Sequence, residues 1–235
     1  MKILNKLFIA AGLYAFSASA YATIIDFKAL ANAQERGYAT ELKFDVNGIE
    51  TTAASAFLTI TGMNGGTASP YLDAGNAGLG VCGGLTGGTY PQCADPSDDN
   101  VSYHTPNPET LYFTFAADVI IESIWLNNNH DGDKSLEDDW VLIDGTSEQL
   151  GAPDGTGDSQ LDLNKLIGFG SSFTVGFDAI SNLIAKGGTC SDGNSYNDCE
   201  FYVSKIEFST VPEPATLGLL GLGLLGMRVA RRRLK

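Results

Sequence analysis

The apolar residues of the chain fall into short runs, rich in β-branched and aromatic side chains, that clusters of Gly, Pro, Asn and Asp separate. This spacing is typical of strands joined by turns. Only Asp178–Lys186 has the pattern of a short helix. We therefore expect an all-β fold, an antiparallel β-sandwich for which a jelly roll is one candidate arrangement. The predicted strands are Ile24–Phe27, Glu41–Val46, Ala56–Thr61, Thr110–Phe115, Val119–Leu126, Trp140–Asp144, Ser172–Phe177 and Glu200–Phe208.

Turn residues predict how some of these strands are joined. Asn47-Gly48 lies between two apolar runs and predicts a two-residue hairpin turn of type I′, because both residues tolerate a positive φ. Two long polar connections, Met63–Asn100 and Gly187–Cys199, join other strands. No repeat or change of composition divides residues 23–210, so we expect them to form one domain.

The first 22 residues have the organisation of a secretory signal peptide. Lys2 and Lys6 precede an apolar stretch over Leu7–Phe16, and small residues follow, ending in Ala20-Tyr21-Ala22. Signal peptidase accepts such an end, so cleavage after Ala22 is expected, with cleavage after Ala20 as the competitor. The apolar stretch is far shorter than the roughly 20 residues that a membrane helix needs.

Residues 211–235 combine three features in a fixed order. Pro212-Glu213-Pro214 predicts an extended, accessible segment, because proline fixes φ and lacks a backbone donor. The Gly- and Leu-rich run Thr216–Met227 follows; as a helix it would be about 18 Å long, so this C-terminal membrane helix would span a bilayer only marginally. The basic end, Arg228–Lys235, should stay on the cytoplasmic side and leave the domain on the export side.

This order of Pro-Glu-Pro, short apolar helix and Arg cluster resembles the PEP-CTERM sorting signal of bacterial exported proteins. The resemblance implies that Pro212, Glu213 and Pro214 are recognised by an exosortase, a membrane-embedded cysteine transpeptidase of Gram-negative bacteria that make exopolysaccharide. It also implies a transient anchor in the inner membrane and a final location at the cell surface or outside the cell. An ordinary tail anchor is the alternative, but such an anchor gains nothing from so short an apolar run.

The four cysteines lie in the two long connections of the exported part. An even number in an oxidising compartment favours disulfides, and proximity favours Cys82–Cys93 and Cys190–Cys199 among the three connectivities. Zinc is disfavoured, because neither pair has the CxxC spacing of zinc ligands and the chain has only two histidines.

Charge is distributed unevenly along the chain. The whole chain has a formal charge of −14, but residues 23–212 hold 27 acidic and 7 basic side chains and so carry −20. Binding to phosphate groups requires clustered Lys and Arg. We therefore expect neither nucleic acid nor an anionic membrane surface as a partner of the domain.

The sequence lacks the common catalytic motifs. It contains no GxSxG, HExxH, P-loop or dinucleotide-binding pattern, and His104 and His130 are expected to be solvated loop residues. Among 27 acidic side chains some carboxylates must lie close together, but nothing singles out a pair suited to glycoside hydrolysis. We therefore expect a protein that is not an enzyme.

One loop, Asn127–Asp138, matches the ligand spacing of a calcium-binding loop, with oxygen-bearing side chains at positions one, three and five, Gly at six and an acid at twelve. Asn stands at position one instead of Asp, and Asp at position twelve instead of Glu, so this is not an EF-hand domain. Ordinary Asp-Gly turns explain the pattern about equally well. The predicted ligands are Asn127, Asn129, Asp131, Asp133 through its backbone carbonyl, and Asp138.

Three function classes remain. The first is a non-enzymatic surface or biofilm-matrix protein that binds extracellular polysaccharide or another protein, with calcium ordering its loops and with Trp125, Trp140 and Tyr103 available to line a groove. The second is a hydrolase acting on exopolysaccharide, which needs two carboxylates in one cleft. The third is a structural matrix component without a ligand site. We expect the first.

The calcium hypothesis predicts a calcium-dependent melting temperature. With one expected carboxylate replaced by Asn, the dissociation constant should fall in the weak range of roughly 0.1–1 mM, so about 5 mM calcium should raise the melting temperature above its value in chelator. Asp131→Ala should abolish the rise and leave the metal-free melting temperature nearly unchanged. An unmodified protein that melts at the same temperature in calcium and in chelator would show that the Asp-Gly loops are ordinary turns.

Overall fold

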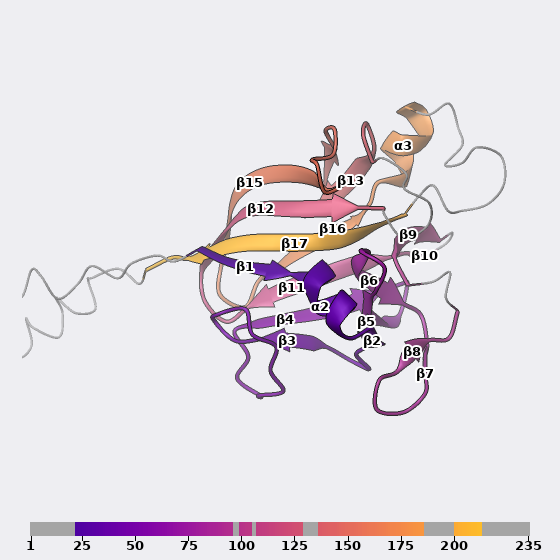
Figure 1. The fold of residues 1–235 in the computed structure, drawn as a ribbon. Coiled ribbons are helices and arrows are strands. Elements are labelled where there is room, and N and C mark those ends of the chain that lie inside the picture. The colour runs from indigo at the N-terminus through magenta and orange to yellow at the C-terminus, as the bar shows by residue number, and fades with distance from the viewer. Residues whose placement is uncertain (1–21, 96–98, 105–106, 129–135, 186–199, 213–235) are drawn as a thin grey trace, which may run out of the picture. The chain divides into compact units, whose positions relative to one another are not determined.

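A computed structural model describes residues 22–95, 99–104, 107–128, 136–185 and 200–212 (Figure 1). The chain divides into two compact units. Ala22–Ser209 is one unit and holds almost all of the described residues. The other consists of Met1–Tyr21 and Thr210–Lys235, of which only residues 210–212 are described.

The first unit is built mainly of strands. Its two helices among the described residues are α2 (Phe27–Ala33) and α3 (Ala179–Ala185). The strands in chain order are β1 (Ala22–Asp26), β2 (Arg36–Gly37), β3 (Leu42–Phe44), β4 (Leu58–Met63), β5 (Thr67–Asp73), β6 (Gly78–Cys82), β7 (Leu85–Thr86), β8 (Gln92–Cys93), β9 (Val101–His104), β10 (Asn107–Pro108), β11 (Thr110–Phe115), β12 (Val119–Asn127), β13 (Trp140–Ile143), β14 (Thr146–Gln149), β15 (Ser159–Ile167), β16 (Ser172–Phe177) and β17 (Glu200–Thr210).

All of these strands except the pair β7–β8 belong to one curled sheet (Figure 1). One part has the order β3-β4-β11-β16-β13-β14, with antiparallel pairing throughout. In the other part β17 is the centre, because β1, β6, β9 and β12 all pair with it. The two parts meet where β4 pairs with β5, at Gly62 opposite Ala68.

The core lies where the sheet curls over itself. Every second residue of β11 is buried, which turns Leu111, Phe113 and Phe115 inward. The Phe115 ring packs edge-on against Phe208 of β17 at 5.2 Å between centroids, and Phe57 stacks on the same Phe208 ring at 5.8 Å. Burying each such side chain stabilises the fold by about 1.5–3 kcal/mol, so these rings tie the two parts of the sheet together.

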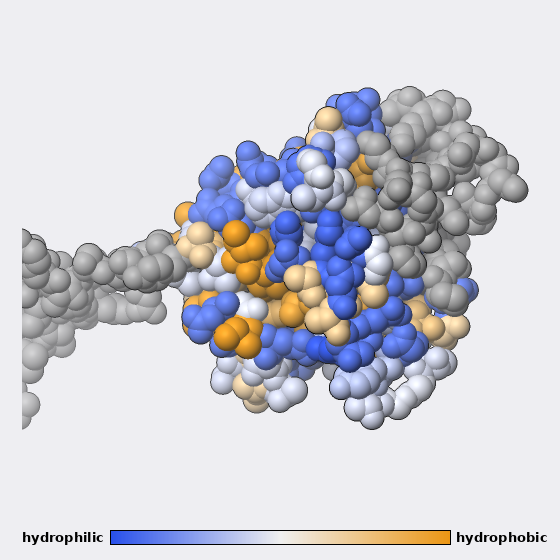
Figure 2. Space-filling model, viewed as in Figure 1, coloured by the Kyte–Doolittle hydropathy of each residue, from blue (hydrophilic) through white to orange (hydrophobic). Residues whose placement is uncertain are grey.

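The structure confirms the predicted all-β character and several of the predicted elements. β11 and β16 have the expected bounds, and β4, β12, β13, β17 and α3 lie within a few residues of theirs. On the face shown in Figure 2, polar side chains cover much of the surface, and apolar ones gather near β1 and the end of β17.

The predicted type I′ turn at Asn47-Gly48 is wrong in type. The chain does reverse here, but only Gly48 has a positive φ. Asp45 Oδ1 accepts hydrogen bonds from the backbone N–H groups of Asn47 and Ile49, both at 2.9 Å, and the Gly48 N–H donates to the Asp45 carbonyl. The Asp45 side chain therefore stabilises a longer turn in which Gly48 alone adopts the left-handed conformation.

The long connection predicted over Met63–Asn100 is also wrong, because it contains β5 and β6 at the centre of the sheet. Gly80 of β6 is buried, and a Cβ built on it would lie 2.0 Å from the backbone oxygen of Asp99. The Val81 N–H donates to the Asn100 carbonyl over 2.9 Å. Glycine is therefore needed here because another backbone segment passes directly over the strand.

None of the helices in the described part of the chain is long and apolar enough to cross a membrane. The predicted membrane segment Thr216–Met227 lies outside the described residues, as do residues 1–21 of the predicted signal peptide.

The close approach at Gly80 predicts a large effect of a single methyl group. Gly80→Ala should lower the free energy of unfolding by about 2–3 kcal/mol, because the backbone of Asp99 cannot move aside as a flexible side chain would. Gly66→Ala is the matched control: no atom lies within 4 Å of a Cβ at that position, so it should change stability by less than about 0.5 kcal/mol. Urea unfolding of both variants measures the difference, and equal midpoints would contradict the predicted contact.

Candidate functional site

A hollow lies on the outer face of the sheet, over β11, β16 and β13. The alternation that turns Phe113 inward turns Thr110 and Tyr112 of β11 outward. Gly176 of β16 pairs with Thr110 on one side and with Leu142 of β13 on the other. Because Gly176 has no side chain, the outer face is open between these two neighbours.

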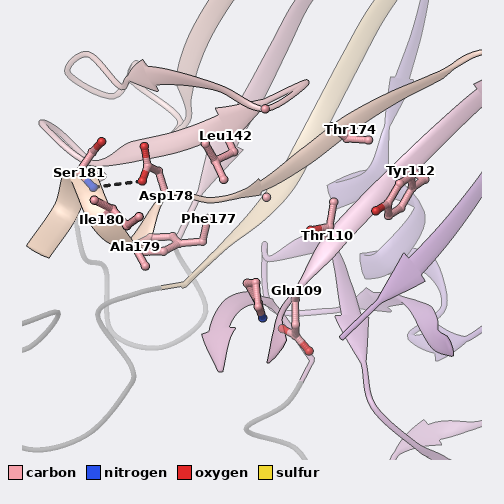
Figure 3. Close-up of a pocket in the computed structure, with 13 residues that line it drawn as sticks. Glu109, Thr110, Tyr112, Leu142, Thr174, Phe177, Asp178, Ala179, Ile180 and Ser181 are labelled. Carbon is pink, nitrogen blue, oxygen red and sulfur yellow. Dashed lines mark hydrogen bonds between the residues drawn. The ribbon is translucent and has the colours of Figure 1, made fainter. Parts of the chain in front are cut away.

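The space above Gly176 is part of a cavity of about 610 Å³ (Figure 3). This volume lies within the range of about 300–1,000 Å³ that small-molecule sites occupy. A Cβ on Gly176 would lie 3.2 Å from Thr110 Oγ1 and 3.3 Å from the Glu109 carbonyl oxygen, so a larger residue would crowd the floor. The lining residues are Pro108, Glu109, Thr110, Tyr112, Leu142, Gly145, Thr174, Gly176, Phe177, Asp178, Ala179, Ile180 and Ser181.

The start of α3 forms one wall of the cavity, and Asp178 and Asn182 hold it in place. Asp178 Oδ1 accepts a hydrogen bond from the Ser181 N–H at 3.0 Å, and its other carboxylate oxygen accepts one from the Ser147 hydroxyl. The Asn182 side chain bonds both the N–H and the carbonyl of Trp140, at 3.0 and 2.7 Å. This wall is therefore rigidly attached to β13.

Two carboxylates, those of Glu109 and Asp178, line the cavity, and both make local hydrogen bonds. Glu109 is fully buried, and its Oε2 accepts hydrogen bonds from the N–H and hydroxyl of Ser102 at 3.0 and 2.8 Å. Figure 3 shows the two carboxyl groups on separate sides of the lining, with that of Asp178 turned toward Ser181. The remaining polar groups at the surface of the cavity include the hydroxyls of Tyr112, Thr110 and Thr174, which are uncharged.

The aromatic residues that the sequence offered for a groove are not the ones found here. Trp125 of β12 and Trp140 of β13 do not line the cavity, and Tyr103 has no described side chain. Two lining residues carry rings, Tyr112 and the buried Phe177, and the sequence argument named neither of them for the site. The alternation of Leu111, Phe113 and Phe115 with polar residues already indicated that Tyr112 faces outward, but not what lies beside it.

The structure describes only two of the predicted calcium ligands. Asn127 is buried, and its Nδ2 donates to the Ala77 carbonyl at 2.7 Å and to Ser204 Oγ at 2.5 Å. Asp138 is exposed, with a φ of 68°, and its Oδ1 accepts from Gln149 Nε2. The other three, Asn129, Asp131 and Asp133, lie outside the described residues.

No group of three His, Cys, Asp or Glu side chains suited to a metal ion occurs within the described part of the chain. A neighbouring residue that the sequence argument did not name is Asn128, which is 3% exposed. Its Oδ1 is buried and accepts no hydrogen bond in the structure. The calcium loop stays a prediction.

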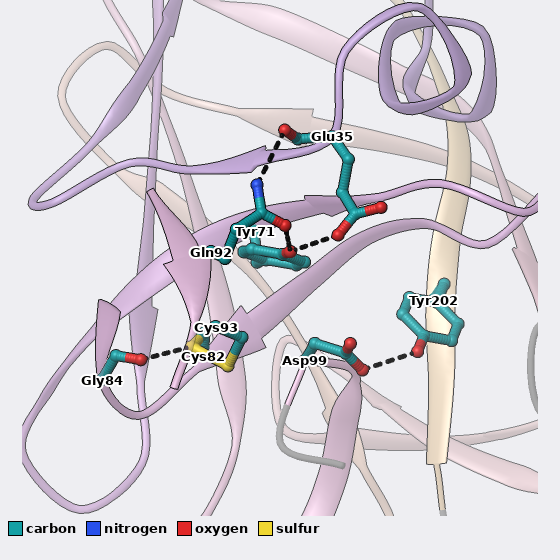
Figure 4. Close-up of a disulfide and its surroundings, with 8 residues drawn as sticks. All are labelled: Glu35, Tyr71, Cys82, Gly84, Gln92, Cys93, Asp99 and Tyr202. Atoms are coloured by element: carbon teal, nitrogen blue, oxygen red, sulfur yellow. Dashed lines mark hydrogen bonds between the residues drawn. A yellow bond between two sulfur atoms is a disulfide. The ribbon is translucent and has the colours of Figure 1, made fainter. Parts of the chain in front are cut away.

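One predicted disulfide is present. Cys82 at the end of β6 is bonded to Cys93 of β8, with 5.8 Å between the Cα atoms (Figure 4). Nearby, the Tyr71 hydroxyl donates to Glu35 Oε1 at 2.7 Å, and burial raises the pKa of Tyr71. The other predicted pair, Cys190 and Cys199, lies outside the described residues.

Comparison with known proteins identifies the end of the chain. The family model described as the PEP-CTERM protein-sorting motif matches residues 210–233. No curated protein and no solved structure matches the chain. The matched motif belongs to exported proteins that are held transiently in the membrane and sorted by an exosortase, which confirms the resemblance seen at Pro212, Glu213 and Pro214.

The sorting motif predicts a shorter mature protein. In a host with an exosortase, the form outside the inner membrane should lack Leu217–Lys235, because the apolar run is too short to serve as a stable membrane span. Intact-mass measurement of the extracellular protein tests this. A mass that still includes Arg231, Arg232 and Arg233 would contradict the processing.

Proposed function

Because the chain ends in a PEP-CTERM sorting motif, we propose that its β domain acts at the cell surface or in the biofilm matrix, as a non-enzymatic module that binds extracellular polysaccharide. The observation that carries the proposal is the cavity over Gly176 on the outer face of the sheet. Signal peptidase and the exosortase would be its processing partners, and the inner membrane its temporary anchor.

The chemistry of the cavity suits a neutral sugar. A sugar ring has apolar C–H faces and a rim of hydroxyl groups, so it needs an aromatic or aliphatic surface together with hydrogen-bonding groups. Tyr112 and Leu142 supply the surface. The Thr110 hydroxyl can donate and accept hydrogen bonds, and the Thr174 hydroxyl, which donates to Asp144 Oδ1 at 3.4 Å, can accept one. The charge of −20 over residues 23–212 favours a neutral polysaccharide over an acidic one.

The hydrolase alternative has less support from the geometry. Glycoside hydrolysis needs two carboxyl groups that face the same bond from opposite sides, one of them able to give up or take a proton. Asp178 holds the start of α3 through Ser181 and Ser147, and Glu109 holds β9 through Ser102. Both carboxylates therefore make hydrogen bonds that position the walls of the cavity.

We also propose that calcium binds the loop after β12 and orders it. Asn128 supports it, because a buried side-chain oxygen without a hydrogen bond costs about 1–3 kcal/mol and is the type of ligand that calcium prefers. The melting experiment with Asp131→Ala tests this part separately from the polysaccharide site.

The site predicts a specific loss of binding when the ring is removed. Screening the oxidised protein on a glycan array identifies a ligand, and titration calorimetry then gives its affinity. Tyr112→Ala should weaken binding about tenfold, because it removes the ring contact and its buried area. Tyr90→Ala is the control, since Tyr90 is a tyrosine that is 51% exposed and lies outside the cavity lining.

Three results would overturn the proposal. The first is the absence of any ligand on the array, and the second is equal weakening by Tyr112→Ala and Tyr90→Ala. The third is release of reducing ends from the bound polysaccharide that Glu109→Gln or Asp178→Asn abolishes, because that result would identify a hydrolase.

A further inference from the structure

Exposed apolar side chains gather at one end of the domain. Eight large hydrophobic residues of the described part are exposed, and five of them belong to this group, which we call the apolar end. Phe169 is 72% exposed, and Leu166 and Ile49 are each 64% exposed. Figure 2 shows apolar surface over the region where β1 begins and β17 ends. The apolar end consists of Ile24, Val46, Ile49, Leu166 and Phe169.

Three of these side chains lie on β1 or on the turn beside it. Ile24 pairs with Glu207 near the end of β17. Thr23 Oγ1 donates to the Val46 carbonyl over 3.2 Å, which places the turn that carries Val46 and Ile49 against the same strand.

The other two side chains reach this end from the opposite side of β17. The hydroxyl of Ser209 donates to Glu122 Oε1 over 2.6 Å, so the first residues of β12 lie beside the last residues of β17. Leu166 pairs with Ile120 near the start of β12, and the Phe169 N–H donates to Asp118 Oδ1 at 2.7 Å.

Both ends of the domain's chain leave it here. Ala22 pairs with Ser209, so β1 begins where β17 ends. In the sequence an apolar stretch precedes Ala22, and the apolar run of the sorting motif begins a few residues after Pro212. The six residues from Thr210 to Ala215 are joined by five steps and reach at most about 18 Å when fully extended. Once the tail has entered a bilayer, the point where β17 leaves the domain must lie within about that distance of it.

We propose that the apolar end rests on the lipid surface while the tail is still attached, and that this contact holds Pro212 at the membrane where the exosortase acts. The inference rests on the sorting motif and is independent of the polysaccharide site. The tether supports lipid as the occupant, because it raises the effective concentration of the surface to about the millimolar range.

The charges of this end favour zwitterionic lipid over anionic lipid. Asp45 and Asp118 lie next to the apolar side chains, bonded to the backbone of Ile49 and Phe169. The hydrogen bond from the Ile49 N–H lowers the pKa of Asp45, so Asp45 stays negatively charged at the surface. So few apolar groups bind a bilayer only weakly without a tether, and removal of the tail should therefore release the domain.

Photo-crosslinking of the full chain in vesicles tests the contact. We would replace Phe169 with p-benzoylphenylalanine and insert the protein in vesicles of phosphatidylethanolamine and phosphatidylcholine. Ile180 provides the matched control: it is also 72% exposed, but it follows β16 whereas Phe169 precedes it. Irradiation should give about tenfold more lipid adduct from position 169 than from position 180, because interfacial groups sit about 5–10 Å into the headgroup region.

Three outcomes would overturn the proposal. Equal lipid labelling at the two positions would show that the apolar end has no preferred contact with the bilayer. Crosslinked dimers at position 169 in place of lipid adducts would identify a second copy of the chain as the occupant. A protein that does not float with the vesicles would remove the tether on which the proposal rests.

Discussion

The structure depends on β17, the last strand of the domain. β1, β6, β9 and β12 all pair with it, and its Phe208 packs against Phe57 and Phe115 of the other part of the sheet. These contacts join residues far apart in sequence, so the core cannot close until β17 has been exported. The strand on which the core depends therefore leads directly into the sorting motif, which the family model matches from residue 210.

A buried polar network fixes the same strand at Ser204. Asp158 is fully buried; it accepts a hydrogen bond from Ser204 of β17 at 2.8 Å and pairs with Lys28 of α2 at 2.9 Å. Asn127 continues the network from β12 through Ser204. Such a network specifies one arrangement because removing any member leaves a buried polar group without its partner. Asn127, the first of the predicted calcium ligands, therefore already makes hydrogen bonds within the domain through its amide nitrogen.

Local sequence pattern predicted the elements whose residues decide their own structure. The alternation in β11 is an example, because its buried and exposed positions follow directly from the pleat. The local pattern failed for elements whose structure depends on tertiary contacts. β5 contains Pro70, whose missing N–H argues against a central strand, although its carbonyl still accepts from the Tyr38 N–H. β6 contains glycines that close contact with another backbone segment requires. The same limit applies to the site, since the partners of Tyr112 come from strands that only the folded sheet brings together.

Tertiary contacts also decide the start of the domain, where the strand predicted over Ile24–Phe27 ends one residue early, at Asp26. Asp26 caps α2 by accepting a hydrogen bond from the Ala29 N–H at 2.8 Å, and Phe27 turns into the core against Phe44 and Phe113. An Asp before apolar residues is a signal for the start of a helix. Here the β-branched residues of β1 precede it and favour a strand, and the helix that follows is short, so the sequence pattern indicated a strand.

The two surfaces of the domain lie at opposite ends of β16. Phe169 of the apolar end precedes this strand, and Asp178 in the cavity wall follows it. Six residues of strand are about 20 Å long, so a bilayer under the apolar end would not cover the cavity. Polysaccharide binding and membrane attachment are therefore sterically compatible. A chain that still carries its sorting motif could already hold its ligand, and cleavage would release the loaded domain without any change in the site.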